Sequence, residues 1–376
     1  MKWQDLPGPA KFIDDAIQHL RNGFSLVVAT PILIPSGLED AFVDALVHDR
    51  WRLNRVTAQE NEDPLQGLTE KLYIEPERWM GWSVEKFFER LSAGQVIVVE
   101  GVSDSNWDDW RTLLRDFEVA SRRCPADERA VMLVFARGVP NKRIQSRGAA
   151  LELVEWKGVL SEPQVLTYVD QRLRTIRQPS RHHKLIVRQI SSLALWDLGL
   201  ADFLLEQPER EIFDVQLVLE AARQNLMPSG GVPKSAAWEH GGSEHFDGVE
   251  MQHPFVLLEE NDRSGELKRR AWTAQAAELL PQIELRRRAL ASALEKYVSC
   301  PFWIEQKDAR PGQAPLQVLV RSLDELEIGP LAHVAKVKGT RGELWERAKW
   351  LAECRNVLAH LQLLSAADAL DPRLYG

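Results

Sequence analysis

Three side chains near the end of the sequence carry the groups that metal-free cleavage of RNA requires. They are Arg355, Asn356 and His360, in the hexapeptide Arg-Asn-Val-Leu-Ala-His. Histidine titrates near neutral pH, so it can move the protons of a ribose 2′-hydroxyl and of a leaving group. Arginine has a planar guanidinium that holds two phosphate oxygens at once. The sequence therefore offers an acid–base group and a phosphate-binding cation close together in the chain.

An amphipathic helix is expected to position these residues. Over 343–369 the apolar residues recur at spacings close to three and four, which predicts one helix with a buried face. Asn356 and His360 are four residues apart and would share one face. Arg355 would lie roughly 140° from His360 around that helix. The arginine and the histidine could therefore line one cleft without touching each other.

This hexapeptide, in its C-terminal helical setting, resembles the signature of HEPN domains, which are small helical bundles. Many HEPN proteins cut RNA without a metal, while others only bind or have lost activity. The resemblance implies an all-α bundle over 267–376, and a homodimer whose cleft forms between two such helices. It also implies catalytic roles for Arg355 and His360, with Asn356 orienting. A structural alternative stays open, in which Asn356 and His360 bond neighbouring backbone and Arg355 pairs with Glu353 or Asp368.

The first part of the chain, 1–180, alternates buried strands with helical segments. Continuous runs of Val, Ile and Leu are typical of a parallel sheet that is covered on both faces. The predicted strands are 24–29, 95–100, 130–135 and 151–156. This order resembles the P-loop NTPase fold of AAA+ or STAND type. The resemblance implies an α/β nucleotide-binding domain over 1–180 and a helical lid over 181–226.

The loop after the first predicted strand lacks the residues that hold a phosphate. A phosphate loop has the pattern G-x-x-x-x-G-K-[ST], in which glycine N–H groups and a lysine surround the phosphates. Here Ile34 and Pro35 replace the second glycine and the lysine, and only Ser36 matches. Glu100 takes the acidic position of a Walker B strand, and Arg137 the place of a sensor residue or of a solvated loop arginine. We expect Ser36 and Glu100 to be remains of an inactive nucleotide site, with no bound cofactor.

Residues 227–266 are rich in glycine, proline and serine, which predicts a linker or exposed loop. This segment contains His240, His245 and Asp247, with His253 beyond. A pair of histidines near an acid could bind zinc, but no cysteine pair accompanies them. No metal site is expected.

The composition is that of an ordinary globular protein, with 44% hydrophobic and 27% charged residues. No apolar run approaches the roughly 20 residues that cross a bilayer, and the N-terminus lacks a signal-peptide core. Three widely spaced cysteines indicate a reducing, cytoplasmic setting. The net charge of −8 argues against non-specific coating of nucleic acid.

Two functions remain from these observations. The first is an adaptor or regulator of a bacterial defence or stress system, which dimerises or docks a protein partner through the HEPN-like region. The second is a metal-independent endoribonuclease that acts as a dimer on single-stranded RNA. The altered phosphate loop favours the adaptor, because a chain that has lost one active site is a candidate to have lost another.

Overall fold

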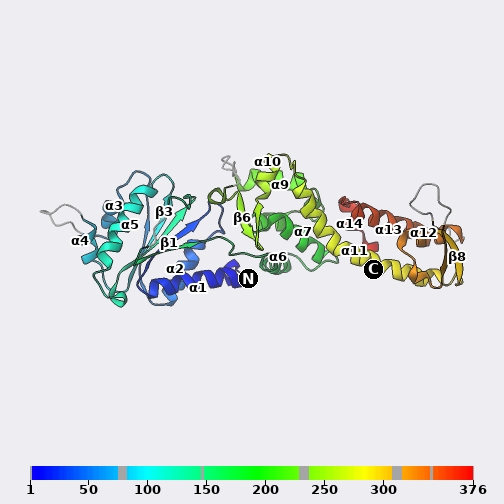
Figure 1. The fold of residues 1–376 in the computed structure, drawn as a ribbon, viewed down its shortest axis with the longest axis horizontal. Helices are drawn as coiled ribbons and strands as arrows, with labels where there is room; N and C mark the ends of the chain where they lie inside the picture. The colour runs from blue at the N-terminus through cyan, green and yellow to red at the C-terminus, as the bar shows by residue number, and fades with distance from the viewer. Residues whose placement is uncertain are drawn as a thin grey trace. The chain divides into compact units, whose positions relative to one another are not determined.

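The computed structural model describes residues 2–74, 83–144, 148–227, 237–306, 316–338 and 342–375 (Figure 1). The chain divides into two units. The N-terminal unit comprises Met1–Arg172, Ala194–Leu205 and Leu219–Asn261, and the C-terminal unit comprises Leu173–Leu193, Glu206–Val218 and Asp262–Gly376. None of the helices in the described ranges has both the length and the apolar character that crossing a membrane requires.

A parallel sheet forms the centre of the N-terminal unit, as the sequence predicted. It has five strands, one more than the sequence indicated. Its strands are β1 (Ser25–Thr30), β2 (Arg52–Thr57), β3 (Gln95–Ser103), β4 (Val131–Arg137) and β5 (Leu151–Glu155). They lie in the order β2-β3-β4-β1-β5, and every neighbouring pair is parallel. This order fits a P-loop-type fold. The sequence did not predict β2, because this edge strand is largely polar and buries only Val56.

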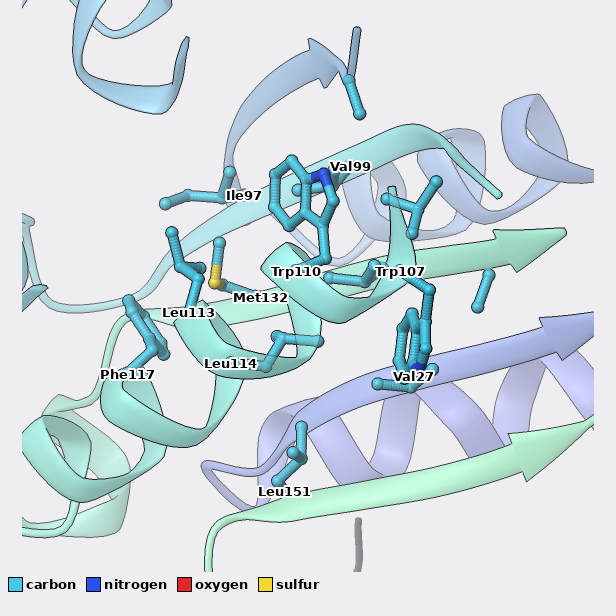
Figure 2. Close-up of a cluster of buried hydrophobic side chains, with 14 of the residues drawn as sticks. Val27, Ile97, Val99, Trp107, Trp110, Leu113, Leu114, Phe117, Met132 and Leu151 are labelled. Atoms are coloured by element: carbon cyan, nitrogen blue, oxygen red, sulfur yellow. The ribbon is translucent and has the colours of Figure 1, made fainter. Parts of the chain in front are cut away.

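Helices cover both faces of this sheet. On one face, α5 (Trp107–Ser121) packs with α3 (Pro64–Lys71) and α4 (Val84–Glu89). Figure 2 shows Trp107 and Trp110 of α5 among Val27, Val99 and Met132 from three strands. On the other face lie α1 (Pro7–Arg21) and α2 (Leu38–His48), where Phe42 meets Phe135 edge-on with ring centroids 5.3 Å apart. Burial of apolar side chains on both faces explains why these strands read as continuous hydrophobic runs.

The remainder of the N-terminal unit includes a segment that the sequence predicted to be a linker. Within 227–266 the chain forms η4 (Trp238–His240), strands β6 (Ser243–Phe246) and β7 (Val249–Gln252), and helix α10 (Pro254–Glu259). The two strands pair as an antiparallel hairpin. Asp247 and Gly248 form its turn with φ of 50° and 80°, the left-handed conformation that a tight hairpin requires. The linker prediction was therefore wrong for 238–259.

The helices between the sheet and this hairpin also differ from the predicted lid over 181–226. They are α6 (Glu162–Ile176), α7 (His183–Ala194), α8 (Leu198–Glu206), η3 (Glu211–Phe213) and α9 (Val215–Leu226). Helices α7 and α8 are separated by a break at Leu195, whose φ is 53°. Consecutive parts of this segment belong to different units, so 181–226 is not a unit of its own.

The C-terminal unit combines helices with a short hairpin, so the expected all-α bundle is incorrect. Its main elements are α11 (Glu266–Leu294), β8 (Phe302–Gln306), β9 (Leu316–Val320), η5 (Leu323–Glu325), α12 (Ile328–Val337), α13 (Glu343–Ala359), α14 (Ala366–Ala369) and α15 (Pro372–Tyr375). Strands β8 and β9 pair antiparallel, and Phe302 and Val320 contribute to the same core as the helices. Helix α11 continues through Pro281. Helices α11 and α12 both pack against α13.

Helix α13 ends ten residues earlier than predicted, at Ala359 rather than Ala369. Leu361 adopts a left-handed conformation with φ of 58°. The N–H of Gln362 donates to the carbonyl of Val357 at 3.0 Å, and that of Leu361 to Leu358 at 3.1 Å. These two bonds form a Schellman cap. Because its left-handed position holds leucine instead of the usual glycine, the sequence gives no stop signal.

Candidate functional site

The loop after β1 lies where a phosphate loop would be, and its polar groups bind other parts of the same unit. The carbonyl of Ile32 accepts from Nε and Nη2 of Arg137 at 3.1 and 3.0 Å. The N–H of Ile32 donates to the carbonyl of Glu239 at 2.9 Å. Arg137, the last residue of β4, is solvent-exposed, and these two hydrogen bonds hold its guanidinium against the loop.

Ser36 and the prolines beside it do not form an anion cradle. Ser36 is exposed, and its carbonyl accepts from Nε1 of Trp3 at 3.0 Å. Pro31 and Pro35 have no N–H to offer a phosphate. Gly37 caps the N-terminus of α2 with φ of 77°. This loop is shaped by its own contacts, and it lacks the run of glycine N–H groups that surrounds a nucleotide.

Glu100, the candidate Walker B acid, is held in an ion pair. It lies on β3 opposite Thr57 of β2, and its Oε1 is 2.5 Å from Nε of Arg55. Arg55 also binds Asp40 of α2 at 2.6 Å. Hydrogen bonding to Glu100 first, and to Asp40 second, raises the pKa of Arg55. A carboxylate that already pairs with a guanidinium is poorly placed to hold a magnesium ion, so Glu100 links β3 to β2 and, through Arg55, to α2.

The three residues of the C-terminal motif lie at the end of α13, and all are accessible to solvent. Arg355 is 42% exposed at its side chain, and Asn356 and His360 are exposed. His360 is the C-cap residue, and its backbone N–H donates to the carbonyl of Asn356 at 3.0 Å. Among the residues that the structure describes, none forms a hydrogen bond with the His360 side chain. The motif is therefore not a buried, fully bonded clasp.

The ion pair of Arg355 also differs from the structural alternative. Its Nη2 lies 3.2 Å from Oε2 of Glu327, at the start of α12. Glu353 lies instead 3.9 Å from Lys349. Asp368 accepts from Trp350 Nε1 at 3.1 Å. The structural alternative named Glu353 or Asp368 as the acid; Arg355 does pair with an acid, but its side chain points across to Glu327 at the start of α12.

Arg355 lines a groove of about 350 Å³ in the C-terminal unit, and His360 does not. The lining residues are Leu280, Ile283, Glu284, Arg287, Asp324, Glu325, Leu326, Glu327, Ile328 and Arg355. They come from α11, from η5, from the start of α12 with the two residues before it, and from α13. The structure therefore separates the two ionisable groups of the motif: one faces this groove, and the other caps the helix.

Arg287 holds one wall of the groove together. Its side chain is 9% exposed, and it donates to both carboxylate oxygens of Glu284 at 2.8 and 2.7 Å. Its Nη1 also donates to the carbonyls of Asp324 and Leu326 at 3.0 and 2.8 Å. The hydrogen bonds from Arg287 lower the pKa of Glu284. Helical spacing of three residues brings Glu284 and Arg287 together, but the contacts with 324–326 depend on folding across more than thirty residues.

Of the histidines that the sequence singled out in this segment, His253 serves the fold, whereas His240 and His245 are exposed. His253 is fully buried, with Nε2 3.1 Å from Oδ2 of Asp197 and Nδ1 accepting from the N–H of Phe255 at 3.2 Å. It is the N-cap of α10. The neighbouring Glu244 is also buried; burial raises its pKa, and hydrogen bonds from the N–H groups of Gly158 and His245 oppose that shift. Within the described ranges, no group of three His, Cys, Asp or Glu residues is placed to hold a metal.

No family model matches this chain, and no curated protein matches it. Among solved structures, the chain is similar to the crystal structure of a DNA replication initiation factor at 12% sequence identity. The alignment covers 96% of this chain and 81% of that one, with a TM-score of 0.26. A likeness at this TM-score carries no argument about function. The P-loop-type fold of the N-terminal unit rests on its own sheet topology. The C-terminal unit is not all-α, and its likeness to HEPN domains stays a prediction.

Proposed function

We propose that this protein is an adaptor or regulator that neither binds nor hydrolyses nucleotide. In this proposal the α/β sheet serves as a scaffold, and the C-terminal unit docks a protein partner. One observation carries the proposal: the loop at the phosphate position is bound by Arg137 and by the backbone of Glu239. The ion pair of Glu100 with Arg55 supports it, because the acid that would hold magnesium is already engaged.

A role in a bacterial defence or stress system, and a homodimeric state, belong to the same proposal. They rest on the resemblance of the two parts of the chain to NTPase and HEPN modules. Such modules occur together in proteins of that kind, and a chain that lacks nucleotide chemistry could still sense or recruit a partner through them.

Titration of ATP and GTP with magnesium into the full chain tests the proposal that the protein does not bind nucleotide. Calorimetry should detect no binding at nucleotide concentrations up to about 1 mM, well above typical nucleotide affinities. The Arg137→Ala variant should behave identically, because freeing the carbonyl of Ile32 restores neither the glycines nor the lysine. Micromolar affinity in the wild-type chain would overturn the proposal. Binding that appears only in Arg137→Ala would also count against it, since the loop would then be capable of holding phosphate.

The endoribonuclease alternative keeps one observation in its favour. His360 is exposed, and within the described part of the chain its side chain makes no hydrogen bond, so it is free to meet a substrate or a second copy. Single-stranded RNA incubated with the protein in EDTA distinguishes the two functions. The adaptor leaves the RNA intact. Cleavage that His360→Ala reduces by roughly 10²- to 10⁴-fold would establish the enzyme instead.

A further inference from the structure

The groove beside Arg355 has an apolar floor that the fold leaves partly open. Leu280 and Ile283 contribute from α11, and Leu326 and Ile328 contribute from the segment that leads into α12. Ile283, Leu326 and Ile328 are buried, whereas Leu280 is 37% exposed. The volume of about 350 Å³ lies at the lower end of the range for ligand pockets. A groove of this size suits a few side chains of a peptide segment.

The rim of the groove is acidic. Four carboxylates line it, and two arginines accompany them, which leaves a net charge of −2. The arginines are Arg287 and Arg355, and the acids are Glu284, Asp324, Glu325 and Glu327. Arg287 is committed to Glu284 and to two backbone carbonyls, so its charge is already balanced.

The acids on the η5–α12 side remain open to a ligand. Asp324 is 62% exposed at its side chain and lies 4.0 Å from Arg287. Glu327 is 75% exposed, and its pair with Arg355 is one between two solvated side chains, which contributes little. A cationic partner could displace that pair at small cost, whereas a phosphate would face unbalanced carboxylates.

We propose that this groove binds a basic amphipathic segment of a protein partner. Apolar side chains of the segment would occupy the floor around Leu280 and Ile328, and its Lys or Arg side chains would meet Asp324 and Glu327. This arrangement follows the way in which amphipathic helices dock into grooves, with apolar anchors on one face and complementary charge around them. The inference names the partner chemistry for the docking function proposed above, and it rests on that function.

The test uses the full-length protein and fluorescent synthetic peptides of about 16 residues, long enough to present two or three helical anchors. One probe has leucines at helical spacing among arginines and lysines. A second replaces its leucines with serines, and a third replaces its basic residues with glutamates. Anisotropy should give a Kd of about 10 µM for the first probe and no saturation for the other two at about 100 µM.

Groove variants, each compared with a control variant outside the groove, show where the peptide binds. Asp324→Lys with Glu327→Lys should weaken binding at least about tenfold, because the attraction becomes repulsion. The control is Glu346→Lys with Glu353→Lys, which makes the same change of charge at exposed positions of α13 outside the groove. Leu280→Ser should weaken binding severalfold, whereas Leu285→Ser, at a more exposed leucine of α11 outside the groove, should not. Far-ultraviolet circular dichroism would show that each variant keeps its helices.

Several results would overturn the inference. They are absence of binding by the first probe, equal losses in the groove and control variants, and equal binding of the serine probe. Self-association of the wild-type chain that the groove variants abolish would show that a second copy occupies the groove. Saturable binding of a labelled single-stranded RNA that Glu327→Lys changes would assign the groove to nucleic acid. None of these results bears on nucleotide binding. Peptide binding tests the groove, whereas the nucleotide titration tests the proposed function, so the two can fail independently.

Discussion

The carboxyl end of the sheet and the groove of the C-terminal unit use charged side chains in opposite ways. Near the end of the sheet, Glu100 is 17% exposed and Arg55 binds it, while Arg137 binds the loop after β1. In the groove, Asp324 and Glu327 are 62% and 75% exposed beside an apolar floor. Polar groups that are satisfied within the fold stabilise it but have little left for a ligand. This contrast supports the proposal that a partner would bind the C-terminal unit rather than the end of the sheet.

The largest loss of stability is expected at Arg287, the buried cation that holds one wall of the groove. Arg287→Met should lower the free energy of unfolding by about 2–4 kcal/mol, because the carbonyls of Asp324 and Leu326 lose their donor. Urea denaturation measures this loss. Arg288→Met is the matched control, since Arg288 is 66% exposed and, among the described residues, bonds Glu284 alone. Equal losses in the two variants would show that the buried contacts add nothing, and the wall of the groove would not be fixed by them.

One carboxylate in each unit should contribute to stability with a pH dependence of opposite sign. Burial raises the pKa of Glu244 above its ordinary value of 4.5, so its contribution to stability is present below about pH 4.5 and is lost as pH rises through the raised pKa. Arg287 lowers the pKa of Glu284, so that contribution is present above about pH 4.5 and is lost as pH falls through the lowered pKa.

Urea denaturation of Glu244→Gln and Glu284→Gln between pH 3 and pH 7 measures these trends, each variant against the wild type. The stability advantage of the wild type over Glu244→Gln should fall as pH rises, and its advantage over Glu284→Gln should grow. Parallel trends would mean that the two carboxylates occupy similar environments, and the contrast between the units would be lost.

The sequence was sufficient to predict the strands whose local hydrophobic pattern matches their burial in the fold. Strands β1, β3 and β4 are buried on both faces, so their hydrophobic runs identify them. Strand β2 lies at the sheet edge and has no such run. The hairpin of β6 and β7 was missed even though its Asp247-Gly248 turn is a recognised hairpin signal, because the surrounding glycines suggested a loop.

The candidate site was less accessible to sequence reasoning because it is made by tertiary contacts. The groove gathers residues from 280–287, 324–328 and position 355, and no local pattern joins these segments. Arg355 was identified for its chemistry, but its partner Glu327 is set by the packing of α12 on α13. The alternation of apolar and acidic residues over 323–328 was the available signal, since it is typical of a segment with one buried and one solvated side.

The smallest effect is expected at His360. A buried histidine whose hydrogen-bond partners were left unmet would cost about 1–3 kcal/mol on substitution. The side chain is exposed and, within the described residues, makes no hydrogen bond. His360→Ala should therefore change the free energy of unfolding by less than about 0.5 kcal/mol, like most exposed substitutions. Asn356→Ala, one turn earlier and also exposed, is the matched control.

A loss above about 1 kcal/mol at His360 alone would reveal a contact with a second copy or with another part of the chain, and the motif would then be structural. With stability unchanged, any difference in RNA cleavage between His360→Ala and the wild type reports chemistry alone, so this variant tests whether the exposed end of α13 is catalytic.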